Sequence, residues 1–126
     1  EDATIVANRD MVAQSLLAAE MAATEGLDVR VIDCHTIKPL DEETILAAAE
    51  ETGALVTAED NVIYGGLGSA VAELLVENEP VPMRRIGVPD TFTESGPYLS
   101  LLAKYGLSAQ HILEAAQEVV ARKRSN

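Results

Sequence analysis

Four short apolar segments alternate with segments whose apolar residues recur at helical spacing, and this alternation constrains the fold more than any other feature of the chain. The apolar segments are residues 4–7, 29–34, 54–58 and 81–88. Strands that alternate with helices pair in parallel, and the helices cover both faces of the sheet through right-handed crossovers. We therefore predict an α/β three-layer sandwich, formed by residues 1–126 as a single domain.

The ends of the helices follow from capping residues. Asp10, Asp41 and Ser108 stand where a side-chain oxygen can accept a hydrogen bond from the first free N–H groups of a helix. Gly26 and Gly53 follow the first two helical segments and are predicted to end them in the left-handed conformation. A further short helix is expected over residues 98–105.

The buried face of two helices follows from the spacing of their apolar residues. For the first helix we predict that Val12, Leu16, Ala19 and Ala23 share the face that packs on the sheet, with Ser15 and Ala22 beside them. For the last helix the predicted buried residues are Ile112, Ala115, Ala116, Val119 and Val120.

A glycine-rich corner joins the third strand to the third helix. Gly65, Gly66 and Gly68 follow two acidic residues, Glu59 and Asp60, which we place in a solvated turn. Glycines before a helix can cradle a phosphate, but the third glycine of the dinucleotide fingerprint is missing and no GK[ST] follows. The two carboxylates would also repel a phosphate. The sequence favours a tight corner in which the helix packs closely on the sheet.

Other reactive side chains give no complete active site. His35 follows the second strand, but no second His or Cys lies at metal spacing, so we predict a loop or interface histidine. Cys34 is predicted to be a small buried residue, and His111 to be on the surface. Ser69 lacks the G-x-S-x-G context of a nucleophile. We therefore predict no catalytic residue and no metal site in this chain.

Net charge and cysteine content exclude several classes of partner. The formal net charge of −12 argues against binding to nucleic acid and to anionic membranes. No apolar run approaches the length of a membrane span. A single cysteine permits no internal disulfide and is typical of the reducing cytoplasm, where we place the protein. The first residue is Glu1, so we expect the chain to be a fragment of a longer protein.

Several motifs resemble one enzyme family. Residues 28–41 read DVRVIDCHTIKPLD, and residues 59–71 read EDNVIYGGLGSAV. Together with RIGVPD at 85–90 and LAKYGLS at 102–108, they resemble the transketolase C-terminal domain of the thiamine-diphosphate enzymes. The resemblance covers essentially the whole chain and favours transketolase, including its split, two-subunit form. The C-terminal domains of 1-deoxyxylulose-5-phosphate synthase and of 2-oxoacid dehydrogenase β subunits remain alternatives.

The resemblance implies a domain without its own cofactor. In that family thiamine diphosphate and a divalent metal are bound by the pyrophosphate and pyrimidine domains, and the activating glutamate belongs to the latter. We expect no cofactor in this chain and no transketolase activity from it alone. Its implied role is to pack against those domains or a separate catalytic subunit, and to support a homodimer of the full enzyme.

The family sheet has a further, antiparallel edge strand, which would lie just before Glu1. Without it we expect four parallel strands in the order 2-1-3-4, with the strand at 29–34 as an open edge.

The carboxyl ends of the first and third strands would then form the switch point of the sheet, where ligands bind in open α/β folds. Arg9 and two helix starts could receive a small anion there, while nearby carboxylates oppose it. A free-standing anion-binding regulatory module is therefore another alternative, although the family commonly has a glycine where this chain has the turn at 8–10. The candidate ligand or interface corner consists of Asn8, Arg9, Asp10, His35, Glu59, Asp60, Gly65, Gly66, Gly68 and Ser69.

Overall fold

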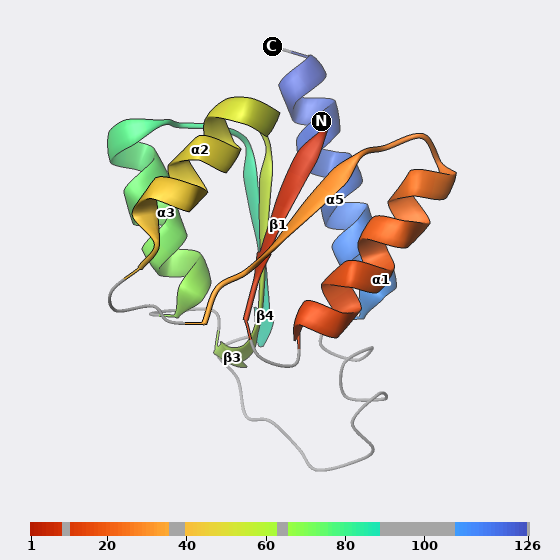
Figure 1. Cartoon of the computed structure of the whole chain (residues 1–126), viewed down its shortest axis with the longest axis horizontal. Helices are drawn as coiled ribbons and strands as arrows, with labels where there is room; N and C mark the ends of the chain where they lie inside the picture. The colour runs from red at the N-terminus through yellow and green to blue at the C-terminus, as the bar shows by residue number, and fades with distance from the viewer. Residues whose placement is uncertain (9–10, 36–39, 63–65, 89–107, 126) are drawn as a thin grey trace.

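The computed structural model describes residues 1–8, 11–35, 40–62, 66–88 and 108–125 (Figure 1). In chain order the elements are β1 (Ala3–Ala7), α1 (Met11–Thr24), β2 (Val29–Asp33), α2 (Glu42–Thr52), β3 (Leu55–Val62), α3 (Leu67–Asn78), β4 (Met83–Val88) and α5 (Ala109–Arg124). The helix predicted over 98–105 and the cap predicted at Asp10 lie outside the described residues. The strand predicted to start at 81 begins at Met83, because Pro82 has no N–H to donate to a neighbouring strand.

The sheet has the predicted topology. Its four strands are parallel and run in the order β2-β1-β3-β4. Ile5 of β1 is aligned with Val31 on one side and with Val56 on the other. Within the described ranges β2 pairs only with β1, so the prediction that this strand forms an edge of the sheet is confirmed.

Helices cover both faces of this sheet, which gives the three predicted layers (Figure 1). Helices α1 and α5 pack on one face and α2 and α3 on the other. All five residues of β1 are buried, and successive side chains enter opposite cores: Ile5 packs with α1 and α5, and Val6 packs with α2 and α3. A central strand covered on both faces must be apolar throughout, and this is why residues 3–7 contain little but apolar side chains.

The prediction for the buried face of α1 is wrong, because the helix is rotated so that the preceding residue is buried at each predicted position. Its fully buried side chains are Met11, Ser15, Ala18 and Ala22, each of which precedes a predicted position. Leu16 is 52% exposed. Small residues turn inward because α1 packs against both the sheet and α5, and the buried Ser15 hydroxyl is satisfied by the Met11 carbonyl at 2.7 Å. The predicted face of α5 is confirmed.

Two glycines end helices as predicted. Gly26 and Gly53 have φ of 82° and 71°, and Gly53 donates its N–H to the Ala49 carbonyl. At the start of α2 the Asp41 carboxylate accepts from Thr44 N at 3.3 Å, which confirms this predicted cap. Ser108 is at the predicted N-cap of α5, but its hydroxyl pairs with His111 Nδ1 at 2.7 Å and makes no cap bond. Gln14 of α1 instead accepts from Ala109 N at 2.9 Å.

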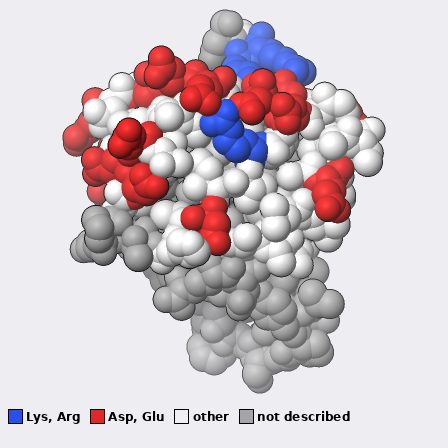
Figure 2. All heavy atoms as spheres, in the orientation of Figure 1, with Lys and Arg blue, Asp and Glu red and all other residues white. Residues whose placement is uncertain are grey.

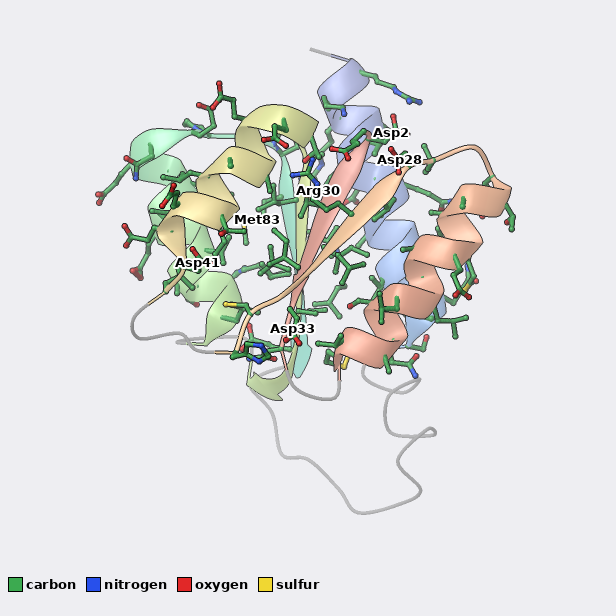
Figure 3. All side chains as sticks on the ribbon, in the orientation of Figure 1. Asp2, Asp28, Arg30, Asp33, Asp41 and Met83 are labelled. Carbon is green, nitrogen blue, oxygen red and sulfur yellow. The ribbon has the colours of Figure 1, made fainter. Side chains whose placement is uncertain are left out.

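Charged residues join the two termini at the amino end of the sheet (Figure 3). Lys123 Nζ donates to the carbonyls of Asp2 and Thr52, each at 2.7 Å, so it links α5 to the start of β1 and to the end of α2. The backbone N–H of Asp28 donates to the Asp2 carboxylate at 2.7 Å, and the Arg124 guanidinium lies 3.1 Å from Asp2 Oδ1. The Asp28 N–H, aided by Arg124 and Lys123, holds the pKa of Asp2 below its usual value of 3.8.

A second ion-pair group lies beside it. Arg30 contacts Glu1 and lies 2.8 Å from Glu51. Hydrogen bonds to Glu51 and Glu1 raise the pKa of this guanidinium above its usual value.

In the part of the chain that is described, no helix has the length and apolar character needed to cross a membrane.

Candidate functional site at the glycine corner

Strand β3 is longer than its apolar pattern predicts, and this changes the environment of the acidic pair. The strand runs from Leu55 to Val62, so Glu59 belongs to the sheet and not to a solvated turn. Its side chain is fully buried, which corrects the predicted exposure. The pairing of β3 with β4 shifts in register between Ala58 and Val62, at the point where the strand carries these polar residues.

The Glu59 carboxylate closes the start of α3. Glu59 Oε1 accepts from Leu67 N at 3.0 Å, and Oε2 accepts from Gly68 N at 2.6 Å. The first N–H groups of a helix have no partner within the helix and lie at the positive end of its dipole. A carboxylate placed there forms two charge-assisted hydrogen bonds, which compensate for its removal from water.

The close approach of Glu59 and β3 to the start of α3 requires glycine at positions 66 and 68. A Cβ at Gly66 would lie 2.0 Å from Glu59 Oε1, which is far too short for a contact between nonbonded atoms. A Cβ at Gly68 would lie 2.9 Å from Thr57 Oγ1 and 3.1 Å from Arg85 Cδ. Neither glycine has a left-handed backbone. Glycine is therefore needed at both positions because there is no room for a Cβ beneath the helix. This agrees with the tight, closely packed corner that the sequence favours.

Two buried polar atoms lie on the strands that lead into this corner. Asn8 is 4% exposed and Thr57 is fully buried, and Asn8 Oδ1 and Thr57 Oγ1 have no hydrogen-bond partner among the described residues. The backbone of Asn8 joins β1 to its neighbours, because its N–H donates to the Ala58 carbonyl and its carbonyl accepts from Met11 N. Both side chains lie where the switch point was predicted.

Of the predicted residues not yet placed, His35 and Ser69 lie within the described part of the chain. His35 is 82% exposed in its side chain, with Nδ1 3.6 Å from Asp33 Oδ1. Cys34 is buried, as predicted. Ser69 lies in the first turn of α3 and is half-buried. Arg9, Asp10 and Gly65, and the side chain of Asp60, lie outside the described residues, so their predicted part in the corner stays a prediction.

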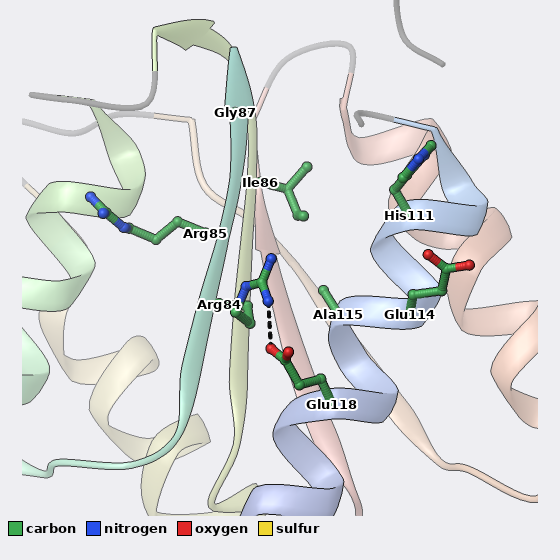
Figure 4. Close-up of a pocket in the computed structure, with 8 residues that line it drawn as sticks. All are labelled: Arg84, Arg85, Ile86, Gly87, His111, Glu114, Ala115 and Glu118. Atoms are coloured by element: carbon green, nitrogen blue, oxygen red, sulfur yellow. Dashed lines mark hydrogen bonds and ion pairs between the residues drawn. The ribbon is translucent and has the colours of Figure 1, made fainter. Parts of the chain in front are cut away.

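A groove between β4 and α5 was not singled out from the sequence (Figure 4). It has a volume of about 390 Å³, and Arg84 on its floor forms an ion pair with Glu118 of α5 at 2.6 Å. His111 lines it and is half-buried, which corrects the predicted surface position. The signal in the sequence was the pair Arg84-Arg85 within an otherwise apolar strand. Arg84 and Glu118 pair with each other and Glu114 also lines the groove, so side chains of both charges meet there and do not by themselves indicate a class of ligand.

Glu59 already occupies the first amides of α3, so the chemistry of the corner does not suit a bound diphosphate. The pyrophosphate of a cofactor would need the amides that Glu59 already holds, beside a buried negative charge. Within the described residues, no group of three or more His, Cys, Asp or Glu side chains could hold a metal ion. These residues therefore do not fit a diphosphate–metal group.

Comparison with known proteins identifies relatives over almost the full chain. A family model described as "Transketolase, C-terminal domain" matches residues 1–112. The 6-deoxy-6-sulfo-D-fructose transketolase subunit SqwH of Clostridium sp. (strain MSTE9) is 53% identical over 97% of the chain, which spans 38% of that subunit. A 1-deoxy-D-xylulose-5-phosphate synthase from Desulforudis audaxviator is 43% identical over 99% of the chain, which spans 20% of that enzyme.

Solved structures give the same result. A split-gene transketolase, described as an inactive beta4 tetramer, superposes with a TM-score of 0.93 at 48% identity; the match covers 98% of this chain and 40% of the other. A transketolase from Pichia stipitis is 16% identical with a TM-score of 0.64, which shows a shared fold alone. The chain thus spans well under half the length of these relatives.

Proposed function

Because the chain belongs to the transketolase C-terminal domain family, we propose that it is the C-terminal domain of an enzyme that transfers two-carbon ketol units between sugar phosphates. The observation that carries this proposal is the 53% identity to a transketolase subunit across 97% of the chain. That relative is a subunit, so we infer that the parent enzyme is of the split type, in which catalytic domains are supplied by another chain. We place the enzyme in the cytoplasm.

In this enzyme the domain has a structural role. The family implies thiamine diphosphate and a divalent metal in the full enzyme. We assign both to the pyrophosphate and pyrimidine domains, because the one glycine-rich helix start described in this chain is closed by its own carboxylate. The hydrogen bonds of Glu59 to the start of α3 then hold this helix in place on the sheet of a domain that packs against those domains. The chain alone is expected to be inactive, and the description of the 48% identical relative as an inactive tetramer supports this expectation.

A second candidate function is favoured by a specific observation. The 43% identity to 1-deoxy-D-xylulose-5-phosphate synthase extends over 99% of the chain. In that case the domain would belong to a 1-deoxy-D-xylulose-5-phosphate synthase and not to a transketolase. Because this chain resembles the same region of both enzymes, the distinction depends on the domains outside it. A free-standing anion-binding module is less well supported, since Glu59 competes with any anion for the amides of Leu67 and Gly68.

Activity with and without the catalytic domains tests this proposal. The chain is purified alone and together with the thiamine-binding domains of its parent enzyme. Ketol transfer from a ketose phosphate to an aldose phosphate is measured in parallel with formation of 1-deoxy-D-xylulose 5-phosphate. We expect ketol transfer only from the combined sample, and no heat of thiamine diphosphate binding to the chain alone in the presence of Mg²⁺. Micromolar binding by the chain alone would contradict the structural role, and formation of 1-deoxy-D-xylulose 5-phosphate without ketol transfer would favour the synthase.

A further inference from the structure

Glu1 and Asp2 precede the first strand, yet contacts from two other elements meet at these residues (Figure 3). The cations that hold them are Lys123 and Arg124 in the last turn of α5 and Arg30 in β2. Figure 2 shows basic side chains gathered at this end of the molecule, next to acidic ones. The first residues of a domain are poorly ordered unless other parts of the fold tie them down, and here they are tied down from two sides.

Lys123 fixes the main chain at the entry to β1. Its Nζ donates to the Asp2 carbonyl and to the Thr52 carbonyl, each at 2.7 Å, so one ammonium group joins this entry to the end of α2. The lysine is half-buried, and a Cβ at Gly53 would lie 3.0 Å from its Cδ, so glycine leaves room for the lysine stem. Because both acceptors are carbonyls, the contact fixes the path of the backbone and does not depend on which side chain residue 2 carries.

The side chains of the first two residues are held as well. The Asp2 carboxylate accepts from the Asp28 N–H at 2.7 Å, and Arg124 lies 3.1 Å from Asp2 Oδ1. Arg30 contacts Glu1 from β2. The main chain and the side chain of Asp2 are thus bound by different elements, so a change in the direction of residue 2 breaks at least one of these contacts.

We propose that Glu1, Asp2, Arg30, Lys123 and Arg124 form a latch that fixes the direction in which the polypeptide enters this domain. The domain then keeps one orientation relative to the domain that precedes it, because the connection cannot bend at residues 1 and 2. Domains joined by a free linker move relative to one another by default. The inference rests on the proposed function, in which further domains of the enzyme precede this one. The 53% identical transketolase subunit is longer than this chain, which spans 38% of it, and this supports the premise.

The distance between this domain and the preceding one tests the proposal in the subunit that contains both. One nitroxide is attached at Val76→Cys, a site that is 73% exposed on α3, which provides no residue of the latch. The second is attached to an exposed position of the preceding domain, and Cys34, which is 5% exposed, should stay unlabelled. Pulsed electron resonance then gives the distribution of distances, and we expect one narrow peak for the wild-type latch.

The latch variant combines Lys123→Met with Arg124→Met. Exposed ion pairs contribute little singly, so the half-buried Lys123 has to be removed together with its neighbour. Residues 1 and 2 are then released from α5, and the distance peak should become about twofold wider or more.

Arg122→Met is the matched control. Arg122 lies in the same turn of α5 and carries the same charge, but it lies 3.4 Å from Glu118, outside the latch, so the narrow peak should remain. Amide exchange of Asp28 reports locally, because its N–H donates to Asp2, and it should rise about tenfold in the latch variant and stay unchanged in the control. Circular dichroism checks folding, and Arg30→Met replaces the latch variant if the latter is unfolded.

A broad distribution in the wild type would overturn the proposal, as would a narrow peak retained in the folded latch variant. Equal widening by the control, or widening without faster exchange of Asp28, would show that the contacts of Glu1 and Asp2 are not its cause and would overturn it too. The measurements need neither cofactor nor substrate. Absent ketol transfer in the combined sample would contradict the proposed function and leave these distances readable, so the two failures are distinguishable.

Discussion

Replacement of Glu59 by glutamine tests whether the buried carboxylate holds the glycine corner together. Glutamine has nearly the same shape, but only one of its terminal atoms can accept a hydrogen bond. One of the two amides, Leu67 N or Gly68 N, would then face an NH₂ group in a fully buried site. We expect Glu59→Gln to destabilise the fold strongly without changing its architecture.

The magnitude follows from the two hydrogen bonds. A bond to a charged acceptor contributes about 1.5–3 kcal/mol against about 1 kcal/mol for a neutral one, and a buried donor left without a partner costs about 1–3 kcal/mol. Loss of the charge at the helix start adds about 0.5–1 kcal/mol. The lower cost of burying a neutral amide offsets part of this sum. We therefore expect a loss of about 2–4 kcal/mol in the free energy of unfolding, a large share of a typical domain's stability.

Urea unfolding followed by circular dichroism measures this change, with Glu77→Gln on the exposed side of α3 as the control. The control should lie within about 0.5 kcal/mol of wild type. A double-mutant cycle sharpens the test: Gly66→Ala collides with Glu59 in the wild-type chain and should cost less in a Glu59→Ala background. If Glu59→Gln is as stable as the control, or if the two substitutions are additive, the carboxylate does not close the corner.

Three further substitutions test other contacts. Lys123→Met removes the donor shared by the Asp2 and Thr52 carbonyls and should cost about 1–3 kcal/mol in urea unfolding; an unchanged midpoint would contradict this link. Gly68→Ala gains about 1 kcal/mol of helix propensity, but its Cβ collides with Thr57, so we expect a net loss that Thr57→Ala relieves. The lowered pKa of Asp2 stabilises the fold above the unfolded value near 3.8, and this contribution is lost as pH falls through the folded value. Asp2→Asn should therefore flatten the fall in stability below pH 3.8, whereas an unaltered slope would show that other carboxyls govern it.

The fold was predictable because its determinants are local and repeated. Alternation of apolar and helical segments predicted a parallel sheet, and the four strands are parallel, whereas their order β2-β1-β3-β4 was expected from the family resemblance. Gly26 and Gly53 were identified as helix ends because each follows an apolar-periodic segment, where a glycine adopts the positive φ of a helix end at little cost.

The errors arise where tertiary packing decides. The spacing of apolar residues in α1 places Val12 and Leu16 inward, yet the helix is rotated by one residue so that Ala18 and Ala22 approach α5 and the sheet. No property of the helix alone distinguishes these two faces, because both are apolar. The exposed Leu16 and Leu17 are the consequence, and they would be costly to solubility unless another surface covers them.

The burial of Glu59 could not be predicted because the carboxylate and its partners come from different elements. An acidic residue after an apolar strand ordinarily marks a solvated turn, and glycines before a helix ordinarily suggest a bound anion. Here each pattern explains the other: Glu59 supplies the negative charge that the start of α3 attracts, and Gly66 and Gly68 supply the space that the carboxylate and the underlying strands need. A glutamate within a strand that is followed by a glycine-rich helix start can therefore fill, from within the protein, a place where an anion would otherwise bind. Gly66 and Gly68 are thus explained by the buried carboxylate and the close packing of α3, in a domain to which we assign no cofactor.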